Sequence, residues 1–120
     1  MGATTFVTKI PMDEFPSVED AFREATRLAL HDFGHDGYSG SIAEKSGFEL
    51  FDVDCSMDLD DFIEALEGSR PGKVLDEVYE MAGEVYGHGD RIVEVFDSKW
   101  GPAVAFEYLG EWVFCGWASC

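Results

Sequence analysis

A run of alternating oxygen-bearing side chains is the pattern in this sequence closest to a metal-binding motif: Asp52, Asp54, Ser56, Asp58 and Asp60. Calcium-binding loops place oxygen ligands at every second position in this way. Two requirements of those loops are not met, because Met57 replaces the glycine of the sharp turn and Glu64 stands one residue beyond the bidentate position. The pattern therefore favours a helix N-terminus surrounded by carboxylates, which the helix dipole stabilises.

Two histidines form the other metal-like pair. His31 and His35 are four residues apart, a spacing that can bind zinc when both lie on one continuous helix. Gly34 stands between them and is expected to end the helix. We therefore predict neither a metal site nor a cofactor.

A glycine-rich segment is the best candidate for contact with a small ligand. Gly34, Gly37 and Gly40 predict an ordered loop. Phosphate-binding loops follow a strand and open a helix, whereas this one follows a helix, so the helix dipole points the wrong way. The candidate contacts are His35, Tyr38, Ser39, Ser41 and Lys45, with His88 from a similar aromatic-Gly-His unit. A small-ligand or nucleotide-binding protein, or a modest enzyme, is thus one alternative function.

Nucleophilic catalysis has no supporting pattern. Serines, Cys55 and three histidines are present, but their spacing does not favour a Ser-His or Cys-His pair. Cys115 lies in an alternating apolar segment, where a buried and inert thiol is expected. Enzymatic activity stays uncertain, and we favour a binding protein.

Carboxylates repeat at helical spacing in two segments. Like charges four residues apart weaken a helix by a few tenths of a kcal/mol per pair. Helix stability therefore does not explain these acids, and a binding function does. We predict that they form a partner-binding surface of Asp60, Asp61, Glu64, Glu67, Asp76, Glu77, Glu80 and Glu84.

The overall charge agrees with such a surface. Among 120 residues, 25 are Asp or Glu and only eight are Lys or Arg, giving a formal net charge of −17. The resulting field repels nucleic acid and anionic membranes and attracts a basic surface of a host protein, so we predict no direct nucleic-acid or membrane binding. A halophile housekeeping domain, in which acidity is an adaptation to salt, is a second alternative.

Cysteine usage and hydropathy bear on location. The three cysteines leave one unpaired in any disulfide scheme, and none forms a CxxC pair. No signal-peptide pattern is present, and no apolar run approaches the roughly 18 residues of a membrane helix. We predict a cytoplasmic protein, in the host cytoplasm if it is phage-encoded.

The elements that position these residues form a single domain over residues 1–120. Strands are predicted over 4–10, 41–44, 47–53, 92–96, 103–109 and 112–117, and helices over 18–33, 58–66 and 71–87. Gly110 and Glu111 are expected to form a type II′ turn. The order β-α-β-β-α-α-β-β-β predicts an α+β fold, with about three helices on one face of a mostly antiparallel sheet. Segment 112–117 is a candidate edge strand for a homodimer.

Three short segments carry a family resemblance: GYSGSIAEK at 37–45, KWGPA at 99–103 and FCGWA at 114–118. In these the chain resembles small uncharacterised acidic proteins of bacteriophages and mobile elements. The resemblance implies a context, the inhibition of a host defence or nucleic-acid-handling protein, and it assigns no functional residue. The acidic helices add the hypothesis that this inhibition works by nucleic-acid mimicry.

Overall fold

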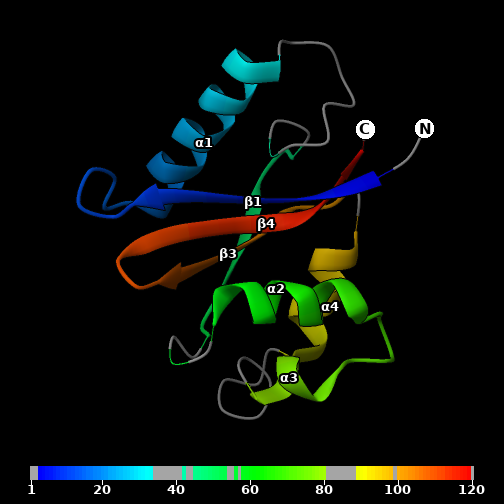
Figure 1. The fold of residues 1–120 in the computed structure, drawn as a ribbon. Coiled ribbons are helices and arrows are strands. Elements are labelled where there is room, and N and C mark those ends of the chain that lie inside the picture. The colour runs from blue at the N-terminus through cyan, green and yellow to red at the C-terminus, as the bar shows by residue number, and fades with distance from the viewer. Residues whose placement is uncertain are drawn as a thin grey trace.

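The computed structural model describes residues 3–33, 42, 45–53, 56, 58–80, 89–98 and 100–119. The predicted α+β class is confirmed (Figure 1). In chain order the elements are β1 (Ala3–Pro11), α1 (Val18–Phe33), β2 (Phe48–Phe51), α2 (Leu59–Gly68), α3 (Asp76–Val78), α4 (Gly89–Asp97), β3 (Ala103–Tyr108) and β4 (Glu111–Ser119).

The four strands form one mixed sheet in the order β1-β4-β3-β2. β4 pairs antiparallel with both β1 and β3, whereas β2 pairs parallel with β3. The sequence left open whether segment 112–117 is an edge strand; it is not one, because β4 has a partner strand on each side. The edges are β1 and β2.

Helices cover both faces of the sheet, with α1 on one and α2 and α4 on the other (Figure 1). The predicted packing of all helices on one face was therefore wrong. The reason lies in β3, whose residues from Ala103 to Phe106 are all buried. Ala103 and Ala105 belong to the core under α1, whereas Val104 and Phe106 belong to the core under α2 and α4. Continuous apolar runs of this kind are typical of strands covered on both sides.

The α1 layer confirms the helix predicted over 18–33. Ala21, Ala25 and Ala29 are buried along its inner face, and such small side chains let the helix lie close to the sheet. Phe22 extends from the helix toward β2, where its ring lies 5.2 Å from that of Phe48 and 5.7 Å from that of Phe114. These contacts fix the position of α1 over the sheet.

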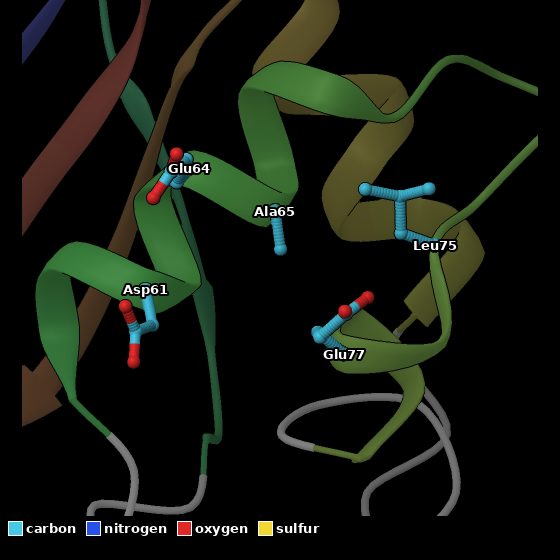
Figure 2. A pocket seen from close by; sticks show the side chains of 5 residues that line it. All are labelled: Asp61, Glu64, Ala65, Leu75 and Glu77. Atoms are coloured by element: carbon cyan, nitrogen blue, oxygen red, sulfur yellow. The ribbon is translucent and has the colours of Figure 1, made fainter.

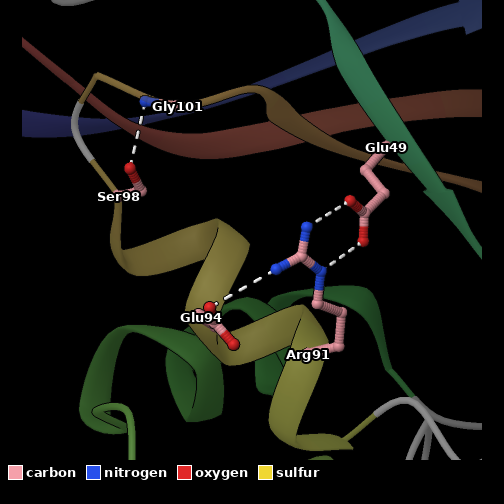
Figure 3. A network of polar contacts seen from close by, with 5 residues as sticks. All are labelled: Glu49, Arg91, Glu94, Ser98 and Gly101. Carbon is pink, nitrogen blue, oxygen red and sulfur yellow. Dashed lines mark hydrogen bonds and ion pairs between the residues drawn. The ribbon is translucent and has the colours of Figure 1, made fainter.

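The opposite layer contains the largest error of the sequence interpretation. Residues 92–96 were predicted as a strand, but they lie within α4. The β-branched residues suggested a strand, yet burial follows a helical repeat, with Ile92, Val93 and Phe96 inside and Glu94 exposed. Arg91 fastens this helix to β2, since its Nε and Nη2 atoms donate to the two carboxylate oxygens of Glu49 at 2.8 and 2.7 Å (Figure 3).

The β3–β4 hairpin turns one residue earlier than predicted. Tyr108 pairs with Glu111, so the two loop residues are Leu109 and Gly110. Their φ angles are 49° and 84°, and positive values at both positions are typical of a type I′ turn, not the predicted type II′. Gly110 also accepts a hydrogen bond from the Met12 amide at 3.0 Å, which joins this hairpin to the end of β1.

Two further predictions need correction. In the predicted strand 41–44, Ile42 is buried outside any strand, and its neighbours 41, 43 and 44 lie outside the described residues. The third helix does not begin at Pro71, because Arg70 and Lys73 form a tight bridged turn with Gly72 at a φ of 83°. Regular helix starts at Asp76, and residues 81–87 of the predicted helix lie outside the described part of the chain.

Candidate functional site: an acidic hollow between α2 and α3

The first wall of the site is α2, whose start is fixed by Asp58. Its Oδ1 accepts hydrogen bonds from the amides of Asp60 at 2.9 Å and Asp61 at 3.3 Å, an N-cap that satisfies otherwise unpaired helix donors. This confirms the interpretation of the acidic run as a helix N-terminus. The apolar side of α2 is buried, which leaves Asp60, Asp61 and Glu64 exposed on the other side.

A buried serine positions the second wall. Ser69 is 1% exposed, and its Oγ donates to the Ala65 carbonyl at 2.8 Å and accepts from the Leu75 amide at 3.1 Å. The chain leaving α2 is thereby held back against the helix. Gly68 permits this approach, because a Cβ at that position would lie 3.0 Å from Leu75 Cδ1. Leu75 and the start of α3 consequently lie beside the last turns of α2.

Between the two walls lies a hollow of about 330 Å³, lined by Asp61, Glu64, Ala65, Leu75 and Glu77 (Figure 2). Ala65 and Leu75 supply an apolar surface, and Leu75 remains 38% exposed. Asp61 and Glu64 come from α2 and Glu77 from α3. The hollow thus combines a small apolar patch with three carboxylates, and none of its described lining residues is basic.

Within the described part of the chain, the carboxylates around this hollow have no counter-ion. No ion pair between described residues involves Asp60, Asp61, Glu64, Asp76, Glu77 or Glu80. The contrast with α1 is clear, since Asp20 there pairs with Arg23 at 3.3 Å and Glu24 with Arg27 at 2.7 Å. A hydrogen bond from Arg27 lowers the pKa of Glu24. Negative charge is therefore partly compensated on α1 and left uncompensated beside the hollow.

The structure brings together only part of the predicted surface. Asp61, Glu64 and Glu77 line the hollow, and the exposed Asp60, Asp76 and Glu80 lie on the same two segments. Glu67 differs, because it is only partly exposed and its Oε2 accepts a 2.9 Å hydrogen bond from Thr5 Oγ1 of β1. Glu84 lies outside the described residues.

Sequence reasoning missed the apolar part of the site. Ala65 had no distinguishing signal, and Leu75 falls within the segment that was expected to be helical. Its exposure follows from the extended backbone before α3 and from the Ser69 hydrogen bond. A side-chain contact between a helix end and the extended segment that follows it leaves no periodic pattern in the sequence.

Most of the predicted ligand loop cannot be placed. His35, Tyr38, Ser39, Ser41 and His88 lie outside the described residues. Lys45 is described and is 4% exposed, with its Nζ donating to the Ser98 carbonyl at 2.9 Å, just past the end of α4. Burial lowers the pKa of Lys45 to about 8.

The described residues offer no other chemical centre. Among residues 3–33, 42, 45–53, 56, 58–80, 89–98 and 100–119, no group of three or more His, Cys, Asp or Glu side chains is placed to hold a metal ion. Cys115 is fully buried, as expected, and burial raises its thiol pKa. No helix in this part of the chain is long and apolar enough to cross a membrane.

Comparison with known proteins adds no family to this picture. No protein-family model matches the chain, and no match was found among curated proteins or solved structures.

Proposed function

We propose that this chain is an acidic partner-binding protein that docks on a basic surface of another protein through the hollow between α2 and α3. The observation that carries this proposal is one hollow that combines an apolar patch, with Leu75 exposed, and three carboxylates that form no ion pair with any described residue. Unpaired carboxylates attract a basic partner over a distance, and the apolar patch gives the contact a short-range component.

Arginine or lysine side chains of the partner suit this hollow. Their aliphatic stems can cover Ala65 and Leu75 while the charged head reaches Asp61, Glu64 or Glu77. Arginine fits better, because its planar guanidinium forms two parallel hydrogen bonds with a carboxylate.

The proposed partner is a host defence or nucleic-acid-handling protein. Surfaces that bind phosphate backbones carry dense Lys and Arg, and a chain of net charge −17 is complementary to them. Duplex DNA carries one charge per roughly 1.7 Å of its axis, a density that a single helix does not reach. Carboxylates from α2 and α3 together support the more specific proposal that the face acts as a nucleic-acid mimic.

The test compares two triple variants that change the net charge by the same amount. Asp61→Asn, Glu64→Gln and Glu77→Gln remove charge from the hollow. The matched control removes the same amount of charge elsewhere, through Asp13→Asn and Glu14→Gln in the turn between β1 and α1 and Glu111→Gln at the start of β4. The probe is a fluorescein-labelled peptide of arginine and alanine, followed by anisotropy at about 0.05 and about 0.5 M salt.

The hollow variant is expected to bind the peptide about tenfold more weakly than wild type, since each carboxylate is worth roughly 0.5 kcal/mol at an exposed site. The control should change affinity less than threefold, and wild-type affinity should fall with salt. Equal losses in the two variants would show that net charge alone attracts the peptide. Either that result or salt-independent binding contradicts the proposed docking site.

A further inference from the structure

One long edge of the sheet has no partner strand within the described residues. β1 is nine residues long and pairs with β4 on one side only. Unpaired backbone N–H and C=O groups along such an edge favour the addition of another strand. Natural edge strands are often short or interrupted by charge or proline. β1 is nine residues long, and its one charged residue, Lys9, and its proline, Pro11, lie in its last third.

The composition of β1 stands apart from the rest of the molecule. The chain carries 25 acidic residues, yet the strand sequence ATTFVTKIP contains none. Its central residue, Val7, is 43% exposed. Lys9 is its only charged residue, and none of the ion pairs between described residues involves it.

We propose that β1 pairs antiparallel with β1 of a second copy of this chain, which would join two sheets into one eight-stranded sheet. A two-fold axis between antiparallel strands of one sheet runs perpendicular to the sheet, so paired residues lie on the same face. When the two strands overlap completely, Val7 of one copy lies opposite Val7 of the other, and the two-fold axis passes between them. In that register Lys9 of one copy lies opposite Thr5 of the other.

Charge complementarity favours this register. Thr5 Oγ1 donates to Glu67 of α2 at 2.9 Å, so the Glu67 carboxylate lies directly over Thr5. Side chains opposite each other on antiparallel strands have Cβ atoms about 5 Å apart. Lys9 of one copy therefore comes within reach of Glu67 of the second copy, and the two-fold axis makes the contact twice. The contact thus joins a lysine that has no ion pair with any described residue of its own chain to a partly exposed carboxylate.

The flank of α1 over this edge carries one exposed apolar side chain, Leu28. Phe22 points toward β2, at the far side of the sheet from β1. Leu28 follows six residues later, which places it about 120° around the helix on the other flank, toward the β1 edge. This leucine is 40% exposed. In the paired sheet the two copies of α1 lie on the same face beside the joint, where Leu28 can be covered.

The experiment is sedimentation velocity across a range of protein concentrations at about 0.05 and about 0.5 M salt. We expect a species of twice the 13.3 kDa chain mass whose fraction rises with protein concentration and with salt. Salt should promote it because screening reduces the repulsion between two chains of charge −17. This dependence is opposite in sign to that expected for a basic partner at the α2–α3 hollow, so the two proposals fail separately.

Four variants test the pairing and its register. Val7→Lys places two ammonium groups against each other at the two-fold axis and should lower the dimer association constant at least tenfold. Leu50→Lys is the matched control, because Leu50 is 49% exposed on the other edge strand and gains the same charge. Lys9→Glu should weaken the dimer, and adding Glu67→Lys to it should restore association by reversing both partners.

Circular dichroism of each variant separates a lost dimer from a lost fold. A folded, monomeric Val7→Lys protein together with a dimeric Leu50→Lys protein supports the pairing. A wild-type chain that stays at 13.3 kDa at the highest concentration and salt overturns it. So does a dimer that persists in Val7→Lys, or one that is broken by Leu50→Lys alone.

Discussion

Lys45 gives the protein a pH dependence of stability whose sign is set by burial. Its side chain is 4% exposed and its pKa is lowered to about 8, against 10.5 for an unburied lysine. Keeping the ammonium form in the folded chain therefore costs free energy at neutral pH. The cost falls as the pH rises above the folded pKa, because the folded chain then loses its proton. It is gone above the unfolded pKa, where both states are neutral.

The expected magnitude follows from linkage. Between pH 7 and pH 9 the unfolded chain keeps its Lys45 proton while the folded chain loses most of it, which raises the free energy of unfolding by about 1 kcal/mol. The perturbation is Lys45→Met, which keeps the length of the side chain and cannot titrate. Stability of wild type relative to this variant should rise by that amount over the interval.

The assay is urea unfolding of both proteins at half-unit steps of pH. Subtracting the variant from wild type cancels the titration of all other groups, and Lys73→Met at an exposed turn gives the background for a lysine-to-methionine change. A flat difference would mean that the Lys45 amine is solvated. A difference of opposite sign would mean that the Ser98 carbonyl and the end of α4 stabilise the ammonium more than burial opposes it.

Two further predictions concern local geometry. Asp58→Ala removes the N-cap of α2 and should lower the free energy of unfolding by about 1 kcal/mol, with Asp58→Asn retaining most of it, as measured by urea unfolding. Gly110→Ala forces a side chain into the left-handed region at a φ of 84° and should cost about 1 kcal/mol, with Gly110→Asn costing less. Equal stability of the Ala and Asn variants would contradict the N-cap hydrogen bonds at Asp58 and the left-handed backbone conformation at Gly110.

Local signals predicted the elements whose period was unambiguous. The apolar stripe of α1 placed that helix correctly over 18–33, and the acidic run before α2 was correctly interpreted as a helix start. In α4, β-branched residues conflicted with a helical burial pattern, and the packing of Ile92 and Phe96 under the sheet decided for the helix. Local preference yields to tertiary packing in such cases.

The candidate site shows a different limit. The exposed carboxylates of α2 followed from helical spacing, but the hollow depends on Ser69 holding Leu75 against Ala65. That contact joins a residue at the end of a helix to one in a segment without regular structure, so no periodic sequence pattern predicts it. The sheet order was hidden for the same reason, since β2 and β3 pair across three intervening helices.

The pairing of the first strand with the last has a consequence for synthesis. Ala3 lies opposite Ser119, and β1 contacts no other strand of the sheet. While the polypeptide grows on the ribosome, β1 therefore stays without its hydrogen-bonded partner strand until β4 has been synthesised. Contacts so distant in sequence are slow to form, and an early chain fragment exposes a strand prone to wrong pairing. The emergence of β4, and not the appearance of the first half of the fold, is thus the moment at which this sheet can close.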